Sequence, residues 1–182
     1  AVAAGAFALI PDVDILHAFV GILESPPSDP LMANEAFWTI SRDSHRGLTH
    51  SLVIGAPAAV SFGLLRGSRP WRAVGASGLV AVLALATIVT DVVGFLLLSL
   101  FVLAGFGVVI GARRLGVGTI GTIWAASVGL LSHPFGDLFT GTPPPLLYPL
   151  DVTVFESRVA PFADPTLDLL LAFAVELAVL WV

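Results

Sequence analysis

The run 73–112 constrains the fold most strongly, because it contains a single charged residue, Asp91. As one continuous helix it would measure roughly 60 Å, about twice the hydrocarbon thickness of a bilayer. The run therefore predicts a hairpin of two membrane-spanning helices with Asp91 at the turn. The alternative, which stays open, is an intramembrane carboxylate with a functional role.

The composition of the whole chain indicates the same class of protein. Hydrophobic residues make up 57% of the sequence, charged residues 12%, and the mean hydropathy is +0.97, whereas a soluble domain carries about 25% charged residues. Further apolar runs at 48–65, 115–132 and 169–182 predict more spans, and residues 1–10 predict part of another. We expect an all-α, polytopic transmembrane helical bundle of about five to six membrane segments. It should form a single integral membrane domain over residues 1–182, with trimmed ends.

Charge and cysteine content exclude several classes of function. The chain has no cysteine, which excludes disulfides and thiolate metal ligands. It has no lysine and a net charge of -5, whereas a nucleic-acid-binding protein should show a basic patch. The expected partners are the lipid bilayer and a small-molecule or lipid substrate, and no nucleic acid.

The arginines and the polar loops predict the topology. Arginines cluster at 66–72 and again at 113–114, and two predicted spans separate the clusters, so both should lie on one side. By the positive-inside rule this side is cytoplasmic. Counting spans then places the two long polar loops, 24–46 and 139–168, on the opposite face together with all four histidines. We expect a multi-pass protein of the cell (inner) membrane whose site faces the extracytoplasmic side.

Each histidine stands beside a carboxylate or another histidine, at the end of an apolar run. Scattered core or surface histidines would have no reason to gather in one layer, although each of them alone could be a headgroup-facing or packing residue. The pattern predicts a metal site at the membrane boundary. The expected ligands are Asp12, Asp14, His45, His50, His133 and Asp137.

Local spacing bears on how these ligands could meet. Asp12 and Asp14 follow Pro11 on a turn, where both can face one ion or cap the next helix. His133 and Asp137 share a face of a continuous helix, unless Pro134 kinks it. His45 and His50 are five residues apart, a spacing that does not place both on one face of a helix. We expect a turn at Gly47 that lets His45 fold back over a helix beginning near Thr49.

The ligand types indicate a divalent metal and a hydrolytic reaction. Imidazole and carboxylate without thiolate suit zinc, manganese, iron or nickel, and we expect zinc, or else manganese, as one or two ions. A metal-activated water is the usual nucleophile of such sites, and two ions would favour phosphoester cleavage. Arg46, between two histidines, could bind the phosphate in a bidentate manner. His17 is a second candidate catalytic residue, although neutral packing at the interface explains it equally well.

Three segments carry a resemblance to a known family. They are Pro-Asp-Val-Asp at 11–14, His-Arg-Gly-Leu-Thr-His-Ser at 45–51, and Ser-His at 132–133 followed by Asp137, Thr140, Gly141 and Leu-Tyr-Pro at 147–149. In this order they resemble the YdjM-like family of inner-membrane metal-dependent hydrolases. The resemblance spans nearly the whole chain and implies a helical membrane fold, but no substrate. It also implies a metal and catalytic set of Asp12, Asp14, His45, His50, His133 and Asp137.

The sequence departs from the family pattern at two places. A short N-terminal segment with its own Thr-His pair, usual in the family, is absent here, which fits trimmed ends and removes one ligand. Pro134 stands where an aliphatic residue is usual, which affects the helical geometry of His133 and Asp137.

Two other functions compete with a metal-dependent hydrolase. A metal-independent lipid phosphatase would explain His133, Asp137 and Gly141, but it needs a Ser-Gly-His segment and a lysine that this chain lacks. A metal or proton transporter would use Asp91 and Glu176 as pathway carboxylates. Transport predicts polar residues deep in several spans, whereas charge here concentrates at their ends. We therefore expect hydrolysis of a phosphoester in a lipid or lipid-linked substrate.

Overall fold

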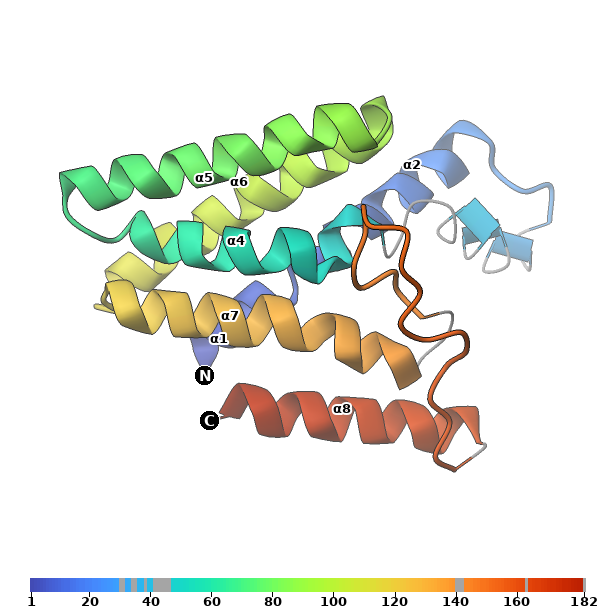
Figure 1. Cartoon of the computed structure of the whole chain (residues 1–182). Helices are drawn as coiled ribbons and strands as arrows, with labels where there is room; N and C mark the ends of the chain where they lie inside the picture. The colour runs from blue at the N-terminus through green and yellow to red at the C-terminus, as the bar shows by residue number, and fades with distance from the viewer. Residues whose placement is uncertain are drawn as a thin grey trace.

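The described part of the chain is helical. The structure is a computed structural model that describes residues 1–29, 32–33, 36–37, 39–40, 47–139, 143–162 and 164–181. The α-helices are α1 (Val2–Ala8), α2 (Leu16–Glu24), α4 (Leu52–Leu64), α5 (Arg69–Val89), α6 (Val92–Arg114), α7 (Thr119–Gly136) and α8 (Pro165–Trp181) (Figure 1). Short 3-10 helices are η1 (Pro11–Ile15), η3 (Leu48–His50) and η4 (Asp137–Phe139). The predicted all-α membrane fold is confirmed.

Three helical stretches among the described residues are long and apolar enough to cross a membrane. They are Val2–Glu24, which contains α1, η1 and α2, and the helices α5 and α6. Helix α4 is apolar but has only 13 residues, fewer than the 17 or so that a perpendicular span needs. The expected total of five to six segments stays a prediction.

The predicted hairpin over 73–112 is present as α5 and α6, which lie side by side (Figure 1). Asp91 lies at the turn between them, where its side chain caps α6 by accepting a hydrogen bond from Gly94 N at 2.9 Å. A carboxylate at a helix N-terminus satisfies backbone donors and suits the helix dipole. Capping therefore explains Asp91 better than a position inside a span.

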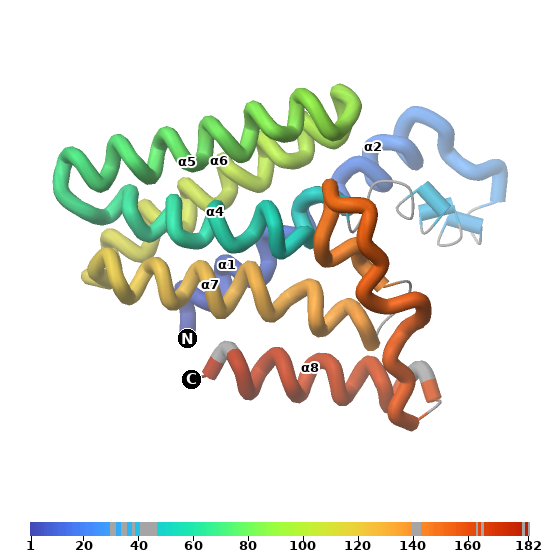
Figure 2. The backbone as a smooth tube through the Cα atoms, viewed as in Figure 1, coloured from blue at the N-terminus to red at the C-terminus, as the bar shows by residue number. Residues whose placement is uncertain are grey.

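The two arginine-rich loops meet at one end of the bundle. The guanidinium of Arg66, after α4, donates to the carbonyl oxygen of Val117, before α7, at 3.2 and 2.8 Å. The backbone tube shows both loops at one end and η3, which precedes α4, at the other (Figure 2). Both arginine-rich loops therefore lie at the same end of the bundle, as the predicted topology requires. The side of the membrane on which each end lies stays a prediction.

Close helix packing places η1 next to the end of α7. Phe7 of α1, Phe62 of α4 and Phe101 of α6 are fully buried, with ring centroids 5.7 and 6.3 Å apart in that order. On α7, a Cβ atom at Gly129 would lie 2.4 Å from the carbonyl oxygen of Ala4. Only glycine allows α1 and α7 to pack this closely. The contact therefore sets the position of η1, the segment that follows α1.

A non-helical segment between η4 and α8 covers the start of α4. Leu52 N donates to Leu146 O at 2.8 Å, and the Ser51 hydroxyl donates to the carbonyl oxygen of Tyr148. The Tyr148 hydroxyl in turn donates to Val89 O at the end of α5, at 2.5 Å. This segment, the described part of the second polar loop, lies beside η3 at the end away from the arginine loops (Figure 1).

Candidate metal centre

Two aspartates enter the site from the 3-10 turn η1. Helix α1 ends at Ala8 and the 3-10 turn begins at Pro11, whose ring removes a backbone donor. The predicted turn is thus present, but its two carboxylates diverge. Asp12 Oδ1 lies 3.2 Å from Nε2 of His133, whereas Asp14 Oδ2 lies 3.3 Å from Nδ1 of His50.

His50 is the last residue of η3 and is fully buried. Gly47 precedes η3 as its N-cap, at the position of the predicted turn. Ser51 then caps α4 by accepting a hydrogen bond from Val53 N at 3.1 Å. The α-helix therefore begins at Leu52, and the 3-10 turn before it directs the imidazole into the bundle.

His133 lies in the last turn of α7 and Asp137 directly after the helix. Although Pro134 lies inside α7, the helix continues to Gly136. His133 Nε2 is 3.9 Å from Asp137 Oδ2, in an i, i+4 relation. The predicted shared face is therefore retained despite the proline.

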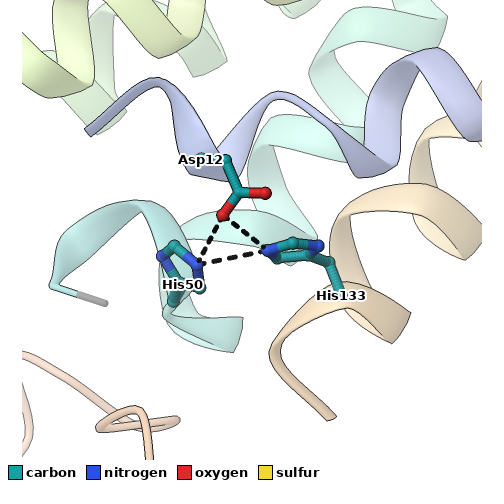
Figure 3. Close-up of side chains that lie close together, drawn as sticks. All are labelled: Asp12, His50 and His133. Carbon is teal, nitrogen blue, oxygen red and sulfur yellow. Dashed lines mark hydrogen bonds and ion pairs between the residues drawn. The ribbon is translucent and has the colours of Figure 1, made fainter. Parts of the chain in front are cut away.

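Three ligand atoms from these elements converge on one point, and a carboxylate oxygen of Asp137 lies beside them. His50 Nε2 lies 3.2 Å from His133 Nε2, 3.7 Å from Asp12 Oδ1 and 3.1 Å from Asp137 Oδ2. Figure 3 shows Asp12, His50 and His133 pointing toward one another from three separate segments. Ligands about 2.0–2.2 Å from a tetrahedral zinc ion stand roughly 3.3 Å apart. Asp12, His50 and His133 lie close enough to bind one metal ion. Asp137 lies beside this group, 3.1 Å from His50 Nε2.

The outward-facing nitrogens of both imidazoles meet carboxylates. His50 Nδ1 is 3.3 Å from Asp14 and 3.0 Å from Thr49 Oγ1, which itself donates to Asp14 at 2.5 Å. His133 Nδ1 is 3.3 Å from Glu176 Oε1. A carboxylate stabilises a proton on the nitrogen it faces, which leaves the lone pair of Nε2 for a metal. Two such lone pairs and the Asp12 carboxylate meeting at one point fit a cation.

The pKa of His50 reflects the same arrangement. Burial lowers this pKa, but hydrogen bonds to Asp12, Asp137 and Asp14 outweigh burial and hold it well above its ordinary value. The carboxylates therefore favour a positive charge at the centre of the cluster. A divalent ion would supply that charge and displace the proton from His50.

His17, a further predicted site residue, lies outside the cluster. His17 is on α2 and lines a cavity of about 370 Å³ together with Asp14, Thr49, Asp91 and Tyr148. His45 and Arg46 lie outside the described residues, so their predicted roles stay predictions.

Two residues of the site were not predicted as part of it. Thr49, which bridges Asp14 and His50, stands inside the segment that carries the family resemblance. Glu176 is the only charged residue in the run 169–182. Such an isolated charge indicates that a polar partner lies nearby, but the sequence does not show which residue this is. The structure supplies the partner, because α8 packs beside the end of α7.

The fold and the cluster define an integral membrane protein with a possible His/Asp metal site. A family model named YdjM inner membrane protein matches residues 1–182, the whole chain. The protein therefore belongs to the YdjM inner membrane protein family, as the sequence resemblance indicated. Comparisons with curated proteins and with solved structures found no match.

Proposed function

We propose that the protein is a membrane-embedded metal-dependent hydrolase. Its reaction is the cleavage of a phosphoester in a lipid or lipid-linked molecule. The observation that carries the proposal is the convergence of Asp12, His50 and His133 on one point at the end of an apolar bundle. Family membership supports the membrane location.

We assign the metal-ligand roles by the direction in which each side chain points. Asp12, His50, His133 and Asp137 present atoms to the centre and would hold the ion. Two imidazoles and two carboxylates suit zinc best, with manganese as the alternative. When bound, such an ion supplies the Lewis acidity that activates water near neutral pH. Asp14, predicted as a ligand, instead holds the Nδ1 proton of His50.

The residues around the centre would handle the substrate. Arg46 precedes Gly47 by one position in the chain and is our candidate for the group that binds the phosphate. His45 completes the predicted ligand set. His17 lines the cavity beside Asp14, and we assign it to contact with the substrate. The cavity has the size of a small-molecule site.

The geometry favours this function over the two competing ones. A transporter would use Asp91 and Glu176 as isolated intramembrane carboxylates, but Asp91 caps a helix and Glu176 faces His133. A metal-independent phosphatase would not need Nε2 atoms of two histidines 3.2 Å apart. Its activity would survive removal of divalent ions with a chelator, which separates it from the proposed reaction.

Metal content tests the first part of the proposal. Detergent-purified protein, loaded with zinc and desalted, should retain zinc when analysed by mass spectrometry. His50→Ala and His133→Ala should lose it, because each removes one converging nitrogen. His17→Ala should keep it, since His17 lies on the cavity and not in the cluster. Equal zinc in all four proteins would contradict the site.

Hydrolysis tests the second part. We expect zinc-loaded protein to cleave a chromogenic phosphodiester and phospholipids in vesicles, and to lose this activity with a chelator. His17→Ala should lower the rate while its zinc content stays unchanged. Retained zinc without cleavage of any phosphoester would leave a metal-binding membrane protein and refute the hydrolase.

A further inference from the structure

The inward-facing stripe of α8 ends at the metal cluster. Asp168 is fully buried and Ala172 is 4% exposed, and Glu176 follows at the same four-residue spacing. Residues spaced in this way share one face of a helix. The neighbouring Val175 and Leu177 are 45% and 69% exposed, as expected for side chains that face lipid. Glu176 therefore points toward α7 and not toward the bilayer.

A lone carboxylate in an apolar helix needs a specific partner. Charged side chains within a membrane are costly and usually pair with another polar group. Glu176 is the only charged residue of the run 169–182, and its Oε1 lies 3.3 Å from His133 Nδ1. The Glu176 carboxyl group also lies beside Gly136, since a Cβ atom built there would be 3.4 Å from it, an ordinary contact distance.

The contact falls on the side of His133 away from the ligand centre. Nε2 of the same ring faces Asp12 at 3.2 Å and His50 Nε2 at 3.2 Å. A carboxylate that accepts a hydrogen bond from Nδ1–H fixes the ring orientation and makes Nε2 a better ligand. Asp14 stands in the same relation to His50.

We infer that Glu176 is a positioning residue: it accepts a hydrogen bond from Nδ1–H of His133 and so directs Nε2 of that ring to a divalent metal ion. The inference rests on the metal site of the proposed function. It makes α8 a required part of the site, although the ligand atoms come from η1, η3, the end of α7 and η4.

Zinc affinity tests this role in the full chain. Zinc would be titrated against a competing chelator in detergent-purified protein carrying Glu176→Ala or Glu176→Gln. Losing such a partner typically weakens binding about 10- to 100-fold, and we expect this for Glu176→Ala. Glu176→Gln should lose less, because its amide oxygen can still accept a hydrogen bond from Nδ1–H. Leu177→Ala, on the lipid-facing side of the same turn, is the control and should bind as the unmodified chain.

Nitrogen-15 spectra of histidine-labelled protein give a second readout that general loss of stability would not produce. The Nδ1 proton signal of His133 should be present in the unmodified chain and in Leu177→Ala, and absent in Glu176→Ala. The corresponding His50 signal should stay in all of them. Equal zinc affinity in Glu176→Ala and Leu177→Ala, with the His133 signal unchanged, would overturn the inference.

The two proposals fail in different ways. If Glu176→Ala does not fold, the zinc affinity and the His133 Nδ1 proton signal of the volume-matched Glu176→Gln test the role of Glu176 instead. If the unmodified chain binds no zinc, the metal-dependent function fails. The His133 Nδ1 signal then still shows whether Glu176 holds that ring, and its absence would overturn the inference as well.

Discussion

His50 and His133 are the same kind of ligand, but the protein holds them by different means. His50 is fully buried, and its partners are Thr49, the preceding residue, and Asp14, which is 1% exposed. The His133 side chain is 10% exposed, and its partner Glu176 is 23% exposed and comes from the last helix. The His50 side is therefore a buried network of several partners, whereas the His133 side is a single, partly exposed contact.

This difference predicts unequal costs of mutation. A buried donor that loses its acceptor has no water to replace it and carries the full desolvation penalty. A partly exposed donor can turn to water instead. Changes at the His50 side should therefore lower both stability and zinc affinity, whereas changes at the His133 side should lower mainly affinity.

Gly129→Leu should have the largest effect, because it breaks the geometry that both histidines share. A Cβ atom at Gly129 would meet the Ala4 carbonyl oxygen at 2.4 Å and Ala8 N at 2.7 Å. The larger side chain would push α1 away from α7 and carry Asp12 out of the cluster. We expect zinc affinity to fall more than about 100-fold and stability to fall by about 1–3 kcal/mol.

Thermal unfolding and zinc titration check this result. Gly107→Leu on α6 is the matched control, since a Cβ atom there meets nothing within 4 Å. If both leucine variants behaved alike, the α1–α7 contact would not set the geometry of the site.

Asp14→Ala should have the next largest effect. It removes the acceptor of the Thr49 hydroxyl and the carboxylate facing His50 Nδ1, and both partners are buried. We expect a loss of about 1–3 kcal/mol in unfolding free energy and zinc binding weaker by up to about 100-fold. Chemical denaturation and zinc titration measure the two effects. Asp151→Ala, at an exposed position, should change neither. A smaller loss of stability than in Glu176→Ala would contradict the comparison.

Thr49→Val should have a moderate effect. Valine keeps the shape but removes the hydroxyl that links Asp14 to His50 Nδ1, while the direct contact at 3.3 Å stays. We expect stability to fall by about 1 kcal/mol and zinc affinity to fall by less than for Asp14→Ala. Thr49→Ser restores the hydroxyl and should recover most of the affinity. Failure of serine to do so would mean that packing, and not the hydrogen bond, is what matters at this position.

Arg158→Ala should have the smallest effect, confined to the His133 side. Arg158 Nη1 lies 3.6 Å from the buried Asp168, near the start of α8, and is itself 33% exposed. Partly exposed ion pairs contribute about 0–1 kcal/mol, so α8 should loosen only slightly and zinc affinity should fall about twofold. Spectra should shift at His133 and not at His50. Arg69→Ala, exposed at the other end, should leave both unchanged. A shift at His50 would show that the two sides are coupled.

Much of the fold was predictable because the information is local. The run 73–112 is too long for one span, so the hairpin and the turn at Asp91 follow from length and charge alone. The i, i+4 spacing placed His133 and Asp137 on one face, and the helix continues through Pro134. The number of spans was harder to predict, because α4 is shorter than its apolar run and begins only after a 3-10 turn.

Spacing along the sequence could not predict which residues face the Nε2 atoms of the two histidines and which face their Nδ1 atoms. Asp12 and Asp14 are two residues apart and were both predicted as ligands, and spacing alone did not show that Asp12 would face Nε2 of His133 while Asp14 faces Nδ1 of His50. Glu176 is an isolated charge in the sequence, and no spacing rule connects it with a residue on another helix. His45 and Arg46 lie outside the described residues, so their predicted roles stay predictions.

The sequence by itself determined the class of the protein, the end of the bundle that carries arginine and the residue types that could bind a metal. Hydropathy, charge and helical spacing act over a few turns and can be read along the chain. The tertiary structure alone decided which atoms meet. Residues 12, 50, 133 and 176 come together through packing of α1, α4 and α8 around α7, and that packing depends on contacts between distant segments such as Gly129 and Ala4.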